Sequence, residues 1–410
     1  MRETHITIAE LGHRGDGIAH LESGPVYVPG ALPGEEVTAS VDKGRATSVE
    51  FLSKSPERID PICKHYQACG GCSVQHLAEK PYLAWKRGLV EKAFKDRGIE
   101  TTAADTVAAT SGGRRRAVLT ATRAGRHILL GYHEKASHRL VDISECPVLD
   151  PAIVAALPGL KSIAAEAIAK KGDLRVTVLA TTAGLDVSLD NADKNYHRKI
   201  PALSQRTVEL DLARLSVNGE VILEVRPPLL DMAGTGLVPP PGSFTQATHV
   251  AEEALASLVV DGVGAVKAVA DLFSGSGTFA LRLARTANVH AVEGDAAAIA
   301  SFDKALRKPQ GLKKVTFEKR DLIRRPVLPE ELAPFDAVVF DPPRAGAQAQ
   351  AEMLAQSKVK TVVAVSCNPA TLARDLRILI DGGYVLQKVT PVDQFQFSPH
   401  IEVVAILKRE

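Results

Sequence analysis

The sequence predicts a chain of three parts: a small N-terminal β-barrel, an α+β domain and a C-terminal doubly wound α/β domain. Three observations support this division. Residues 1–55 are short β segments separated by glycine turns, Cys63, Cys69 and Cys72 lie close together, and from residue 243 onward strands and helices alternate. The predicted domains are residues 1–55, 56–240 and 241–410.

The N-terminal segment is predicted to be a barrel because turn signals recur between alternating apolar stretches such as HITIAEL, IAHL and PVYVPG. Small barrels of the oligonucleotide-binding (OB) type often bind nucleic acid. An inert accessory barrel would have the same pattern, so the segment alone does not decide.

The middle segment contains a stretch with helical periodicity, KPYLAWKRGLVEKAFKDR, at about residues 80–97. Residues 114–240 alternate short strands with one Ala-rich helix, PAIVAALPGLKSIAAEAIAKKG. The run VPPPG at 238–242 indicates the boundary with the last domain.

The C-terminal segment begins with a helix near 249–260 and continues as alternating strands and helices. The strands are AVADLF, VHAVEG, VTFEKRD, FDAVVFDPP and KTVVAVSC. This order is typical of a doubly wound sheet. The last two strands, YVLQKVTPV and IEVVAILKR, have no helix between them and are predicted to form an antiparallel hairpin.

The distribution of charge indicates a polyanionic partner. The whole chain has a net charge of +2, yet residues 51–140 hold 16 Lys/Arg against 8 Asp/Glu, which leaves a balance of −6 for the remainder. A basic segment of this kind is expected of a protein that binds nucleic acid, although a solvated charged surface has the same composition. The arginines expected to contact phosphate are Arg114, Arg115, Arg116, Arg123, Arg126 and Arg139.

Nothing in the sequence indicates a membrane or an exported protein. No apolar run reaches the roughly 18 residues that a membrane span needs. The N-terminus, MRETHITIAEL, has charges where a secretory signal has an apolar core. We expect a cytoplasmic monomer.

The five cysteines suggest a metal site. In a cytosolic protein, clustered cysteines favour metal binding over disulfides. Cys63, Cys69, Cys72 and Cys146 would supply four thiolates, which can hold zinc or an iron–sulfur cluster. The spacing C-x5-C-x2-C is not the paired C-x2-C of a zinc ribbon.

The loop DLFSGSGTFALRLA predicts a cofactor site. Gly275 and Gly277 let the backbone approach a ligand closely, and a following helix N-terminus favours a polar or anionic group. Glu293, at the end of the next strand, can bind the two hydroxyls of a ribose. A dinucleotide is the obvious rival ligand, but the loop lacks the third glycine of a pyrophosphate site. Asp321, after a third strand, can bind an adenine amino group, so we favour S-adenosylmethionine.

Three polar motifs fall where ligands of doubly wound sheets bind, at the carboxyl ends of the strands. They are DPPRAG (341–346), SCNPATLARD (366–375) and DQFQFSPHIE (393–402). Cys367 precedes a helix whose N-terminus is expected to lower the thiol pKa, which would make it a nucleophile. An inert buried cysteine is the alternative.

A thiolate is useful to a methyltransferase that acts on uracil. Attack on uracil C6 gives an enolate whose C5 can accept a methyl group, after which a base must remove the C5 proton. Glu402 is the best candidate for this base, because a buried acid in IEVVAIL is costly without a role. His400 would point to the same face if the strand is regular.

These motifs resemble those of the RlmD/RumA type of RNA 5-methyluridine methyltransferase, in the TrmA superfamily, and the similarity extends over almost the full chain. The segments GDGIAH, VPGALPGE and SPERIDP are similar to a TRAM domain, an RNA-binding module. The resemblance implies a class I Rossmann-like methyltransferase sheet, with Cys367 as nucleophile and Glu402 as general base. It also implies a [4Fe–4S] cluster on Cys63, Cys69, Cys72 and Cys146. The implied S-adenosylmethionine contacts are Gln246, Phe273, Gly275, Thr278, Glu293, Asp321 and Asp341.

The resemblance leaves several points open. The sequence departs from the family pattern at Thr248, Thr278, Gln396 and Ser398. By analogy the helix near 81–97 packs with the catalytic domain. The RNA is expected to be 23S rRNA, with tRNA as the alternative. Two rival functions are an amino-methyltransferase, which would place an aromatic residue where Arg344 stands, and a non-catalytic RNA-binding assembly factor.

Overall fold

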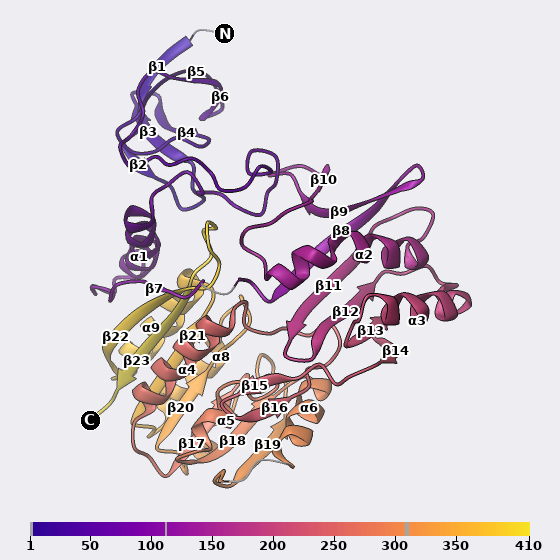
Figure 1. Cartoon of the computed structure of the whole chain (residues 1–410). Coiled ribbons are helices and arrows are strands. Elements are labelled where there is room, and N and C mark those ends of the chain that lie inside the picture. Colours follow the sequence, from indigo (N-terminus) through magenta and orange to yellow (C-terminus); the bar gives the residue numbers. More distant parts are fainter. Residues whose placement is uncertain (1–2, 111–112, 308–310) are drawn as a thin grey trace.

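The computed structural model describes residues 3–110, 113–307 and 311–410. Three bodies follow one another along the chain, with the N-terminal sheet at one end and the C-terminal sheet at the other (Figure 1). None of the described helices combines the length and the apolar character that a membrane span requires.

The N-terminal body is a curled six-stranded sheet in the order β1-β5-β6-β4-β3-β2. Its core consists of small aliphatic side chains such as Ile6, Val28 and Val37, each fully buried. The strands are β1 (Glu3–Thr7), β2 (Glu10–Leu11), β3 (Gly17–Leu21), β4 (Gly24–Val28), β5 (Glu36–Asp42) and β6 (Arg45–Phe51).

The central body is a seven-stranded sheet with helices packed on one face (Figure 1). Its order is β10-β9-β8-β11-β12-β13-β14. The strands are β8 (Arg116–Ala124), β9 (His127–His133), β10 (Leu140–Asp142), β11 (Leu174–Thr181), β12 (Gly184–Asp190), β13 (Arg214–Val217) and β14 (Glu220–Glu224).

The central body has more helix than the sequence predicted. The expected Ala-rich helix is α2 (Pro151–Ala167), which buries Ile153, Leu157 and Leu160 against the sheet. A second helix, α3 (Ile200–Glu209), follows the 3-10 turn η1 (Tyr196–Lys199). We missed α3 because it is short: it has ten residues, of which Leu203 and Thr207 are buried, and so few apolar positions give little sequence signal.

The C-terminal body is an eight-stranded sheet in the order β19-β18-β17-β20-β21-β23-β22-β7. The first five strands of this order are parallel, and β23 is antiparallel to both of its neighbours, which confirms the doubly wound sheet with a terminal hairpin. The strands are β7 (Val107–Ala108), β17 (Ala268–Leu272), β18 (Asn288–Glu293), β19 (Val315–Lys319), β20 (Ala337–Phe340), β21 (Thr361–Ser366), β22 (Val385–Asp393) and β23 (Glu402–Lys408).

Helices cover both faces of this sheet. Buried residues of α1, α8 and α9 belong to one core, and those of α4, α5 and α6 to the other. The short hairpin β15 (Leu230–Met232) and β16 (Thr235–Leu237) joins the second core, so this core extends to residues before 241. The helices are α1 (Glu79–Lys95), α4 (His249–Val263), α5 (Ala280–Leu283), α6 (Ala296–Leu306), α7 (Pro329–Leu332), α8 (Gln348–Gln356) and α9 (Pro369–Asp381).

Candidate functional site

The glycine loop follows β17 at the carboxyl edge of the C-terminal sheet. Gly277 has a φ of +91°, and a Cβ there would lie 2.5 Å from ring atoms of Phe302, so only glycine fits. A Cβ at Gly275 would meet nothing within 4 Å, so the space beside that backbone is open. Phe273 has a φ of +60°, a conformation that side chains rarely adopt outside functional sites.

Glu293 connects this loop to the end of β18. One carboxylate oxygen accepts from Gly275 N at 2.8 Å, and the other accepts from the N–H groups of Gly294 and Asp295. Two carboxylate oxygens have about four lone-pair sites, so acceptor capacity remains for a ligand. The expected helix N-terminus is weak, because α5 begins only at Ala280 and has four residues. Macrodipole effects require a longer helix, so the backbone of the loop must make most of the polar contacts.

Buried carboxyl groups surround this edge of the sheet. Asp271 is 0% exposed, and neither of its oxygens has a hydrogen-bond partner of ordinary geometry among the described residues. Burial, followed by the charge of Asp341, raises the Asp271 pKa well above its usual value. Burial also raises the pKa of Asp341 to about 7. An orphaned acid beside an open glycine loop suits a cationic ligand, and S-adenosylmethionine has both a sulfonium and an ammonium group.

The remaining predicted cofactor residues lie around the same edge. Asp321 is exposed after β19, and its Oδ1 accepts from the N–H groups of Ile323 and Arg324. Thr278 is partly buried in the loop, where its carbonyl accepts from Arg282. Gln246 is buried in the segment that precedes α4. Thr248, one of the departures from the family pattern, is the N-cap of α4 and accepts from Ala251 N.

Cys367 and Glu402 meet at the ends of adjacent strands. Ser366 of β21 pairs with Val403 of β23, so the residues that follow in register, Cys367 and Glu402, lie opposite each other. Asn368 caps α9 and donates to Arg344 O, which ties the cysteine loop to the DPPRAG loop. The two side chains expected to act on one ring are therefore neighbours.

The expected lowering of the Cys367 pKa was wrong. Burial, followed by the charges of Glu402 and Asp341, raises the pKa of Cys367 to about 11. These effects outweigh the helix N-terminus that we expected to stabilise the thiolate. Arg344 is the nearby cation that lowers the thiol pKa, so thiolate formation depends on positive charge at this edge.

Glu402 is the buried acid of the pair. It is 3% exposed, and burial, followed by the Asp341 charge, raises its pKa to about 8. His400 does not share its position, because β23 begins only at Glu402 and His400 is exposed in the preceding turn. The Glu402 Oε1 atom accepts from Gln394 Nε2 at 3.0 Å.

The four clustered cysteines line a single cavity together with Tyr66, Arg114 and Tyr132. Burial raises the pKa of Cys72 to about 12 and of Cys146 to about 11, and the neighbouring cysteines contribute to both shifts. Thiols that repel one another as thiolates need a cationic centre to ionise together. The cavity therefore fits a bound metal.

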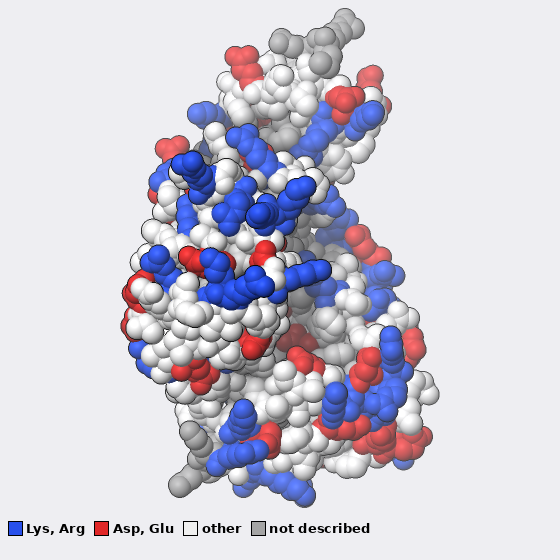
Figure 2. Space-filling model, turned by 90° about the vertical axis from the view of Figure 1, so that its right-hand side faces the viewer, with Lys and Arg blue, Asp and Glu red and all other residues white. Residues whose placement is uncertain are grey.

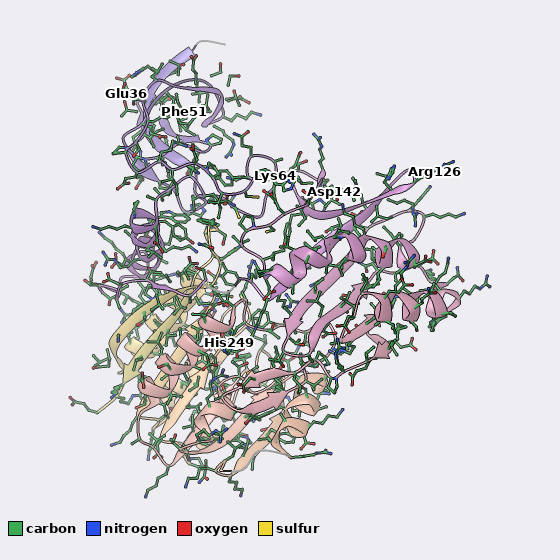
Figure 3. The ribbon with its side chains drawn as sticks, viewed as in Figure 1. Glu36, Phe51, Lys64, Arg126, Asp142 and His249 are labelled. Carbon is green, nitrogen blue, oxygen red and sulfur yellow. The ribbon has the colours of Figure 1, made fainter. Side chains whose placement is uncertain are left out.

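Contacts between the loops bring Cys146 to the other three cysteines. Gly70 N donates to His133 O at 2.9 Å, and a Cβ at Gly70 would lie 2.7 Å from that oxygen, so glycine is required there. Lys64, labelled in Figure 3, donates its backbone N–H to Glu145 at 2.9 Å. A backbone N–H beside Cys63 and the carboxylate beside Cys146 thus join the two cysteine segments.

The sulfur atoms are wider apart than a single ion requires. Among the described residues, the one group of three His, Cys, Asp or Glu ligand atoms within 4.8 Å of one another is His249, Glu252 and Glu253. No three of the cysteine sulfurs meet this limit. Sulfurs that each lie about 2.3 Å from one zinc ion would be closer together than the limit, at roughly 4 Å from one another. The carboxylates of Glu252 and Glu253 in the His249 group are already paired with arginine. Arg282 contacts both of them, and Arg115 contacts Glu252.

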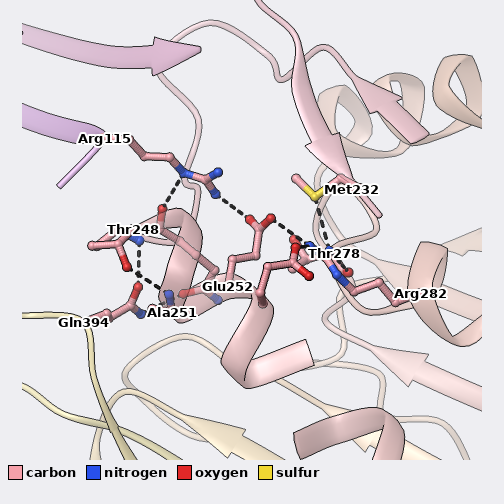
Figure 4. A network of polar contacts seen from close by, with 11 residues as sticks. Arg115, Met232, Thr248, Ala251, Glu252, Thr278, Arg282 and Gln394 are labelled. Atoms are coloured by element: carbon pink, nitrogen blue, oxygen red, sulfur yellow. Dashed lines mark hydrogen bonds and ion pairs between the residues drawn. The ribbon is translucent and has the colours of Figure 1, made fainter. Parts of the chain in front are cut away.

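The arginine run expected to contact RNA faces inward. Arg115 is 7% exposed; its Nε donates to Gln246 O and its guanidinium pairs with Glu252 (Figure 4). Arg116 donates to the carbonyls of Gly242 and Ser243, and Arg114 lies over the Phe395 ring. These three arginines hold the central and C-terminal bodies together. Of the remaining predicted contacts, Arg123, Arg126 and Arg139 are exposed, and Figure 3 shows Arg126 at the tip of the β8–β9 hairpin.

Sequence reasoning missed three residues of the site. Asp271 immediately precedes the glycine loop, and its position at a strand end was the available signal. Arg344 lies within DPPRAG, where we used it only to argue against another enzyme class. Gln394 lies within DQFQFSPHIE, and nothing in the sequence pattern distinguishes it from Gln396.

Comparisons with known proteins give one consistent picture. Residues 238–410 match a family model described as tRNA (uracil-5-)-methyltransferase, and residues 2–50 match the TRAM domain. An uncharacterized RNA methyltransferase of Brucella suis is 49% identical over 404 residues, covering 98% of this chain and 97% of the relative. The 23S rRNA (uracil(1939)-C(5))-methyltransferase RlmD of Chromohalobacter salexigens is 31% identical, covering 99% of this chain and 89% of the relative.

Solved structures agree with the sequence relatives. The Pyrococcus abyssi tRNA (uracil-54, C5)-methyltransferase in complex with S-adenosyl-L-homocysteine superposes with a TM-score of 0.76 at 25% identity. The match covers 98% of this chain and 100% of that one. All of these relatives act on RNA by their names, and those with a named base are uracil-C5 enzymes, which argues against the amino-methyltransferase alternative.

Proposed function

Because the chain belongs to the family of S-adenosylmethionine-dependent RNA uracil-C5 methyltransferases, we propose that it methylates a uridine of 23S rRNA through a covalent bond between Cys367 and uracil C6. The observation that supports this mechanism is the register of β21 and β23, which brings a thiol and a buried carboxyl to adjacent strand ends. Neither group alone would perform the reaction.

The chemistry assigns a separate role to each side chain. Cys367, as thiolate, forms the bond to C6, and the electron pair of the C5–C6 double bond moves into an enolate. S-adenosylmethionine supplies the methyl group that C5 accepts. Glu402 then takes the C5 proton, the double bond reforms, and the Cys367–C6 bond breaks with the electron pair returning to sulfur.

The pKa values of Glu402 and Cys367 determine how much of each group is ionised for these steps. A Glu402 pKa of about 8 lets the carboxyl both hold and release a proton near neutral pH. A Cys367 pKa of about 11 means that few molecules hold a thiolate until a cation neutralises the carboxylates. Arg344, together with the positive charge of bound cofactor, would favour the reactive form.

We propose that the cofactor is held by the glycine loop and the acids around it. Phe273, Gly275 and Thr278 lie on the loop, Gln246 lies before α4, and the remaining contacts are the carboxylates Glu293, Asp321 and Asp341. These side chains come from the carboxyl ends of β17, β18, β19 and β20, where ligands of doubly wound sheets bind.

We propose a [4Fe–4S] cluster on Cys63, Cys69, Cys72 and Cys146. The cavity lined by the four cysteines and the spacing of their sulfurs support a polynuclear group over a single zinc ion. Protein purified without oxygen should be brown and contain about four irons per chain. Stoichiometric zinc without iron in such a sample would show that the metal is different.

The RNA surface extends beyond the catalytic domain. The TRAM match supports RNA binding by the N-terminal body. Figure 2 shows Lys and Arg side chains gathered over the upper half of one face of the molecule. A stacked uridine cannot reach a half-buried thiol, so the base must flip out of its stack into the site.

We favour 23S rRNA as substrate because the relative named for it, RlmD, is 31% identical to this chain, against 25% for the tRNA enzyme. The similar structure from Pyrococcus abyssi is a tRNA enzyme, so tRNA is the alternative. Mapping 5-methyluridine in both RNAs of a deletion strain separates them, since only the true substrate loses the modification.

The covalent step is tested with RNA containing 5-fluorouridine. Fluorine cannot leave as a proton does, so the wild-type enzyme with S-adenosylmethionine should form a protein–RNA complex that survives denaturing electrophoresis. Cys367→Ala should form none. A stable complex with Cys367→Ala would mean that another nucleophile attacks C6.

A further inference from the structure

Gln394 lies between the candidate base and a predicted cofactor contact. It is 1% exposed and follows β22 directly, in the turn that leads to β23. Its side chain contacts three groups: Ala247 N, Gln246 and Glu402. A buried amide with every donor and acceptor used is fixed in one orientation.

The orientation of this amide follows from one backbone donor. Ala247 N lies 2.7 Å from one end of the Gln394 amide, and because a backbone N–H can only donate, that end is the oxygen. The other end is then Nε2, with two hydrogens to donate. One is given to Gln246 Oε1 at 2.7 Å and the other to Glu402 Oε1 at 3.0 Å.

The backbone around Gln394 is anchored on both sides. Lys86 and Asp393 are fully or almost fully buried, and Lys86 Nζ donates to Asp393 Oδ1 at 2.9 Å. Tyr82 of the same helix, α1, donates to the other oxygen of Asp393. On the opposite side, Arg115 donates its Nε to Gln246 O and its backbone N–H to Ala247 O (Figure 4).

These contacts point to a role in the reaction. We propose that Gln394 is a positioning residue, which holds Glu402 for removal of the C5 proton and fixes the amide of Gln246. The proposal rests on the assignment of Glu402 as base. Because Gln394 donates to Oε1, the carboxylate oxygen left without a partner among the described residues is Oε2. Oε2 is therefore the atom that receives the proton.

The same hydrogen bond offsets part of the electrostatic penalty on Glu402. Burial and the charge of Asp341 raise the Glu402 pKa, whereas the Gln394 contact and Arg344 lower it. Without the donor, the ionised base is less stable and its pKa rises further. Since proton removal needs the ionised form, product release would then require a higher pH.

The experiment compares two phases in a single turnover with ordinary uridine RNA. Formation of the denaturation-resistant complex reports attack and methyl transfer, and its disappearance reports proton removal. Gln394→Met keeps the side-chain volume but can neither donate nor accept. At saturating S-adenosylmethionine, we expect complex formation close to the wild-type rate and release slowed by roughly 10-fold or more, the scale of a lost bond to a charged group. The pH of half-maximal release should move upward.

A matched control and a second variant support the interpretation. Gln387→Met replaces an exposed glutamine of the preceding strand, β22, and should leave both phases unchanged. Gln394→Glu keeps an acceptor for Ala247 N, and in its ionised form it donates nothing and adds a charge beside Glu402. It should shift the pH profile of release further upward than Gln394→Met, and it provides the test if the methionine variant does not fold.

Two results would overturn the proposal in different ways. If Gln394→Met and Gln394→Glu release product at the wild-type rate and pH while Glu402→Gln stalls, the positioning role is wrong and the base assignment stands. If Glu402→Gln itself releases product normally, the base assignment fails, and the role of Gln394 fails with it. An equal slowing of both phases at saturating S-adenosylmethionine would show that Gln394 only supports the fold.

Discussion

The methyl-transfer site and the cysteine site are neighbours that are built in opposite ways. The N–H groups of Ser73 and Val74, just after Cys72, donate to Phe397 O in the turn before Glu402. At the methyl-transfer site, strand ends and hydrogen bonds hold the side chains of Glu293, Gln394 and Glu402 before any ligand binds. At the cysteine site, the sulfurs come from two loops, and Gly71 N donates a hydrogen bond to the sulfur of Cys69.

The two sites are therefore expected to depend on their ligands in different ways, one for reaction and the other for stability. A preorganised site needs its ligand for reaction and only slightly for stability. Buried cysteines bind a metal only as thiolates, which repel one another without it, so the free energy of metal binding adds to the folding free energy at such a site. Substitutions in the first site should therefore affect rates, and those in the second should affect stability.

The largest effect is expected at the preorganised site. Cys367→Ala should reduce methyl transfer by roughly 10⁴-fold or more, the scale seen when a catalytic nucleophile is removed. S-adenosylmethionine affinity and the thermal midpoint should stay near wild type, because the carboxylates and the glycine loop remain in place. Methyl incorporation, calorimetric titration of cofactor and a thermal scan measure the three quantities. A large loss of cofactor affinity would mean that the site is not preorganised.

The second effect distinguishes the cysteine site. Cys72→Ser should lose the metal and lower the thermal midpoint by roughly 5–10 °C, which corresponds to a few kcal/mol in a domain of this size. Cys367→Ser is the matched control, since it makes the same substitution at another partly buried cysteine and should keep both iron and midpoint. Equal midpoints for the two variants would remove the contrast between the sites.

The third effect concerns the contact between the central and C-terminal bodies. Arg115→Met leaves Glu252 with Arg282 as its remaining partner, and should cost about 2 kcal/mol of unfolding free energy, below the cost of a fully unpaired buried charge. The salt dependence of RNA binding should not change. Arg126→Met, at an exposed position, should leave stability unchanged. A flatter salt slope in Arg115→Met would mean that this arginine contacts phosphate after all.

The smallest effect is a shift along the pH axis. Arg344 lowers the pKa of the Cys367 thiol against the opposing carboxylates, so Arg344→Met should raise that pKa further above its present value of about 11. Complex formation requires the thiolate, so its rising limb should move to higher pH, by less than about one unit because Arg344 is exposed. Rates of complex formation with 5-fluorouridine RNA across pH measure this. A shift of the rising limb to lower pH would contradict the conclusion that Arg344 lowers the Cys367 pKa.

The local sequence pattern predicted the strands and helices well, but it did not predict the pKa of Cys367 or the burial of Arg115. Each strand and helix around the catalytic motifs follows from periodicity and glycine turns, because these signals are local to each element. The pKa of Cys367 depends on Asp341 and Glu402, which only the sheet brings beside it. The burial of Arg115 depends on Glu252, 137 residues away in sequence. Charge composition alone could not distinguish an arginine that faces RNA from one that joins two domains.

The role of Gln394 could not be predicted from the sequence either, because it depends on contacts that only the fold creates. Gln394 and Gln396 stand in one motif with the same side chain, and only the fold places one between Gln246 and Glu402. The four cysteines were a different case, since their spacing alone indicated a metal. The kind of metal does not follow from the residue type, because four thiolates can hold zinc or an iron–sulfur cluster.

The proposed mechanism depends most on the separate roles of Cys367 as nucleophile and Glu402 as base. Glu402→Gln, with ordinary uridine RNA and S-adenosylmethionine, tests it directly. The nucleophile is intact in this variant, so it should attack C6 and transfer the methyl group, but it should stall before the C5 proton is removed. The predicted result is a methylated protein–RNA complex that survives denaturing electrophoresis and persists after the wild-type enzyme has released its product. Normal turnover without such a complex would contradict the assignment of Glu402 as the base.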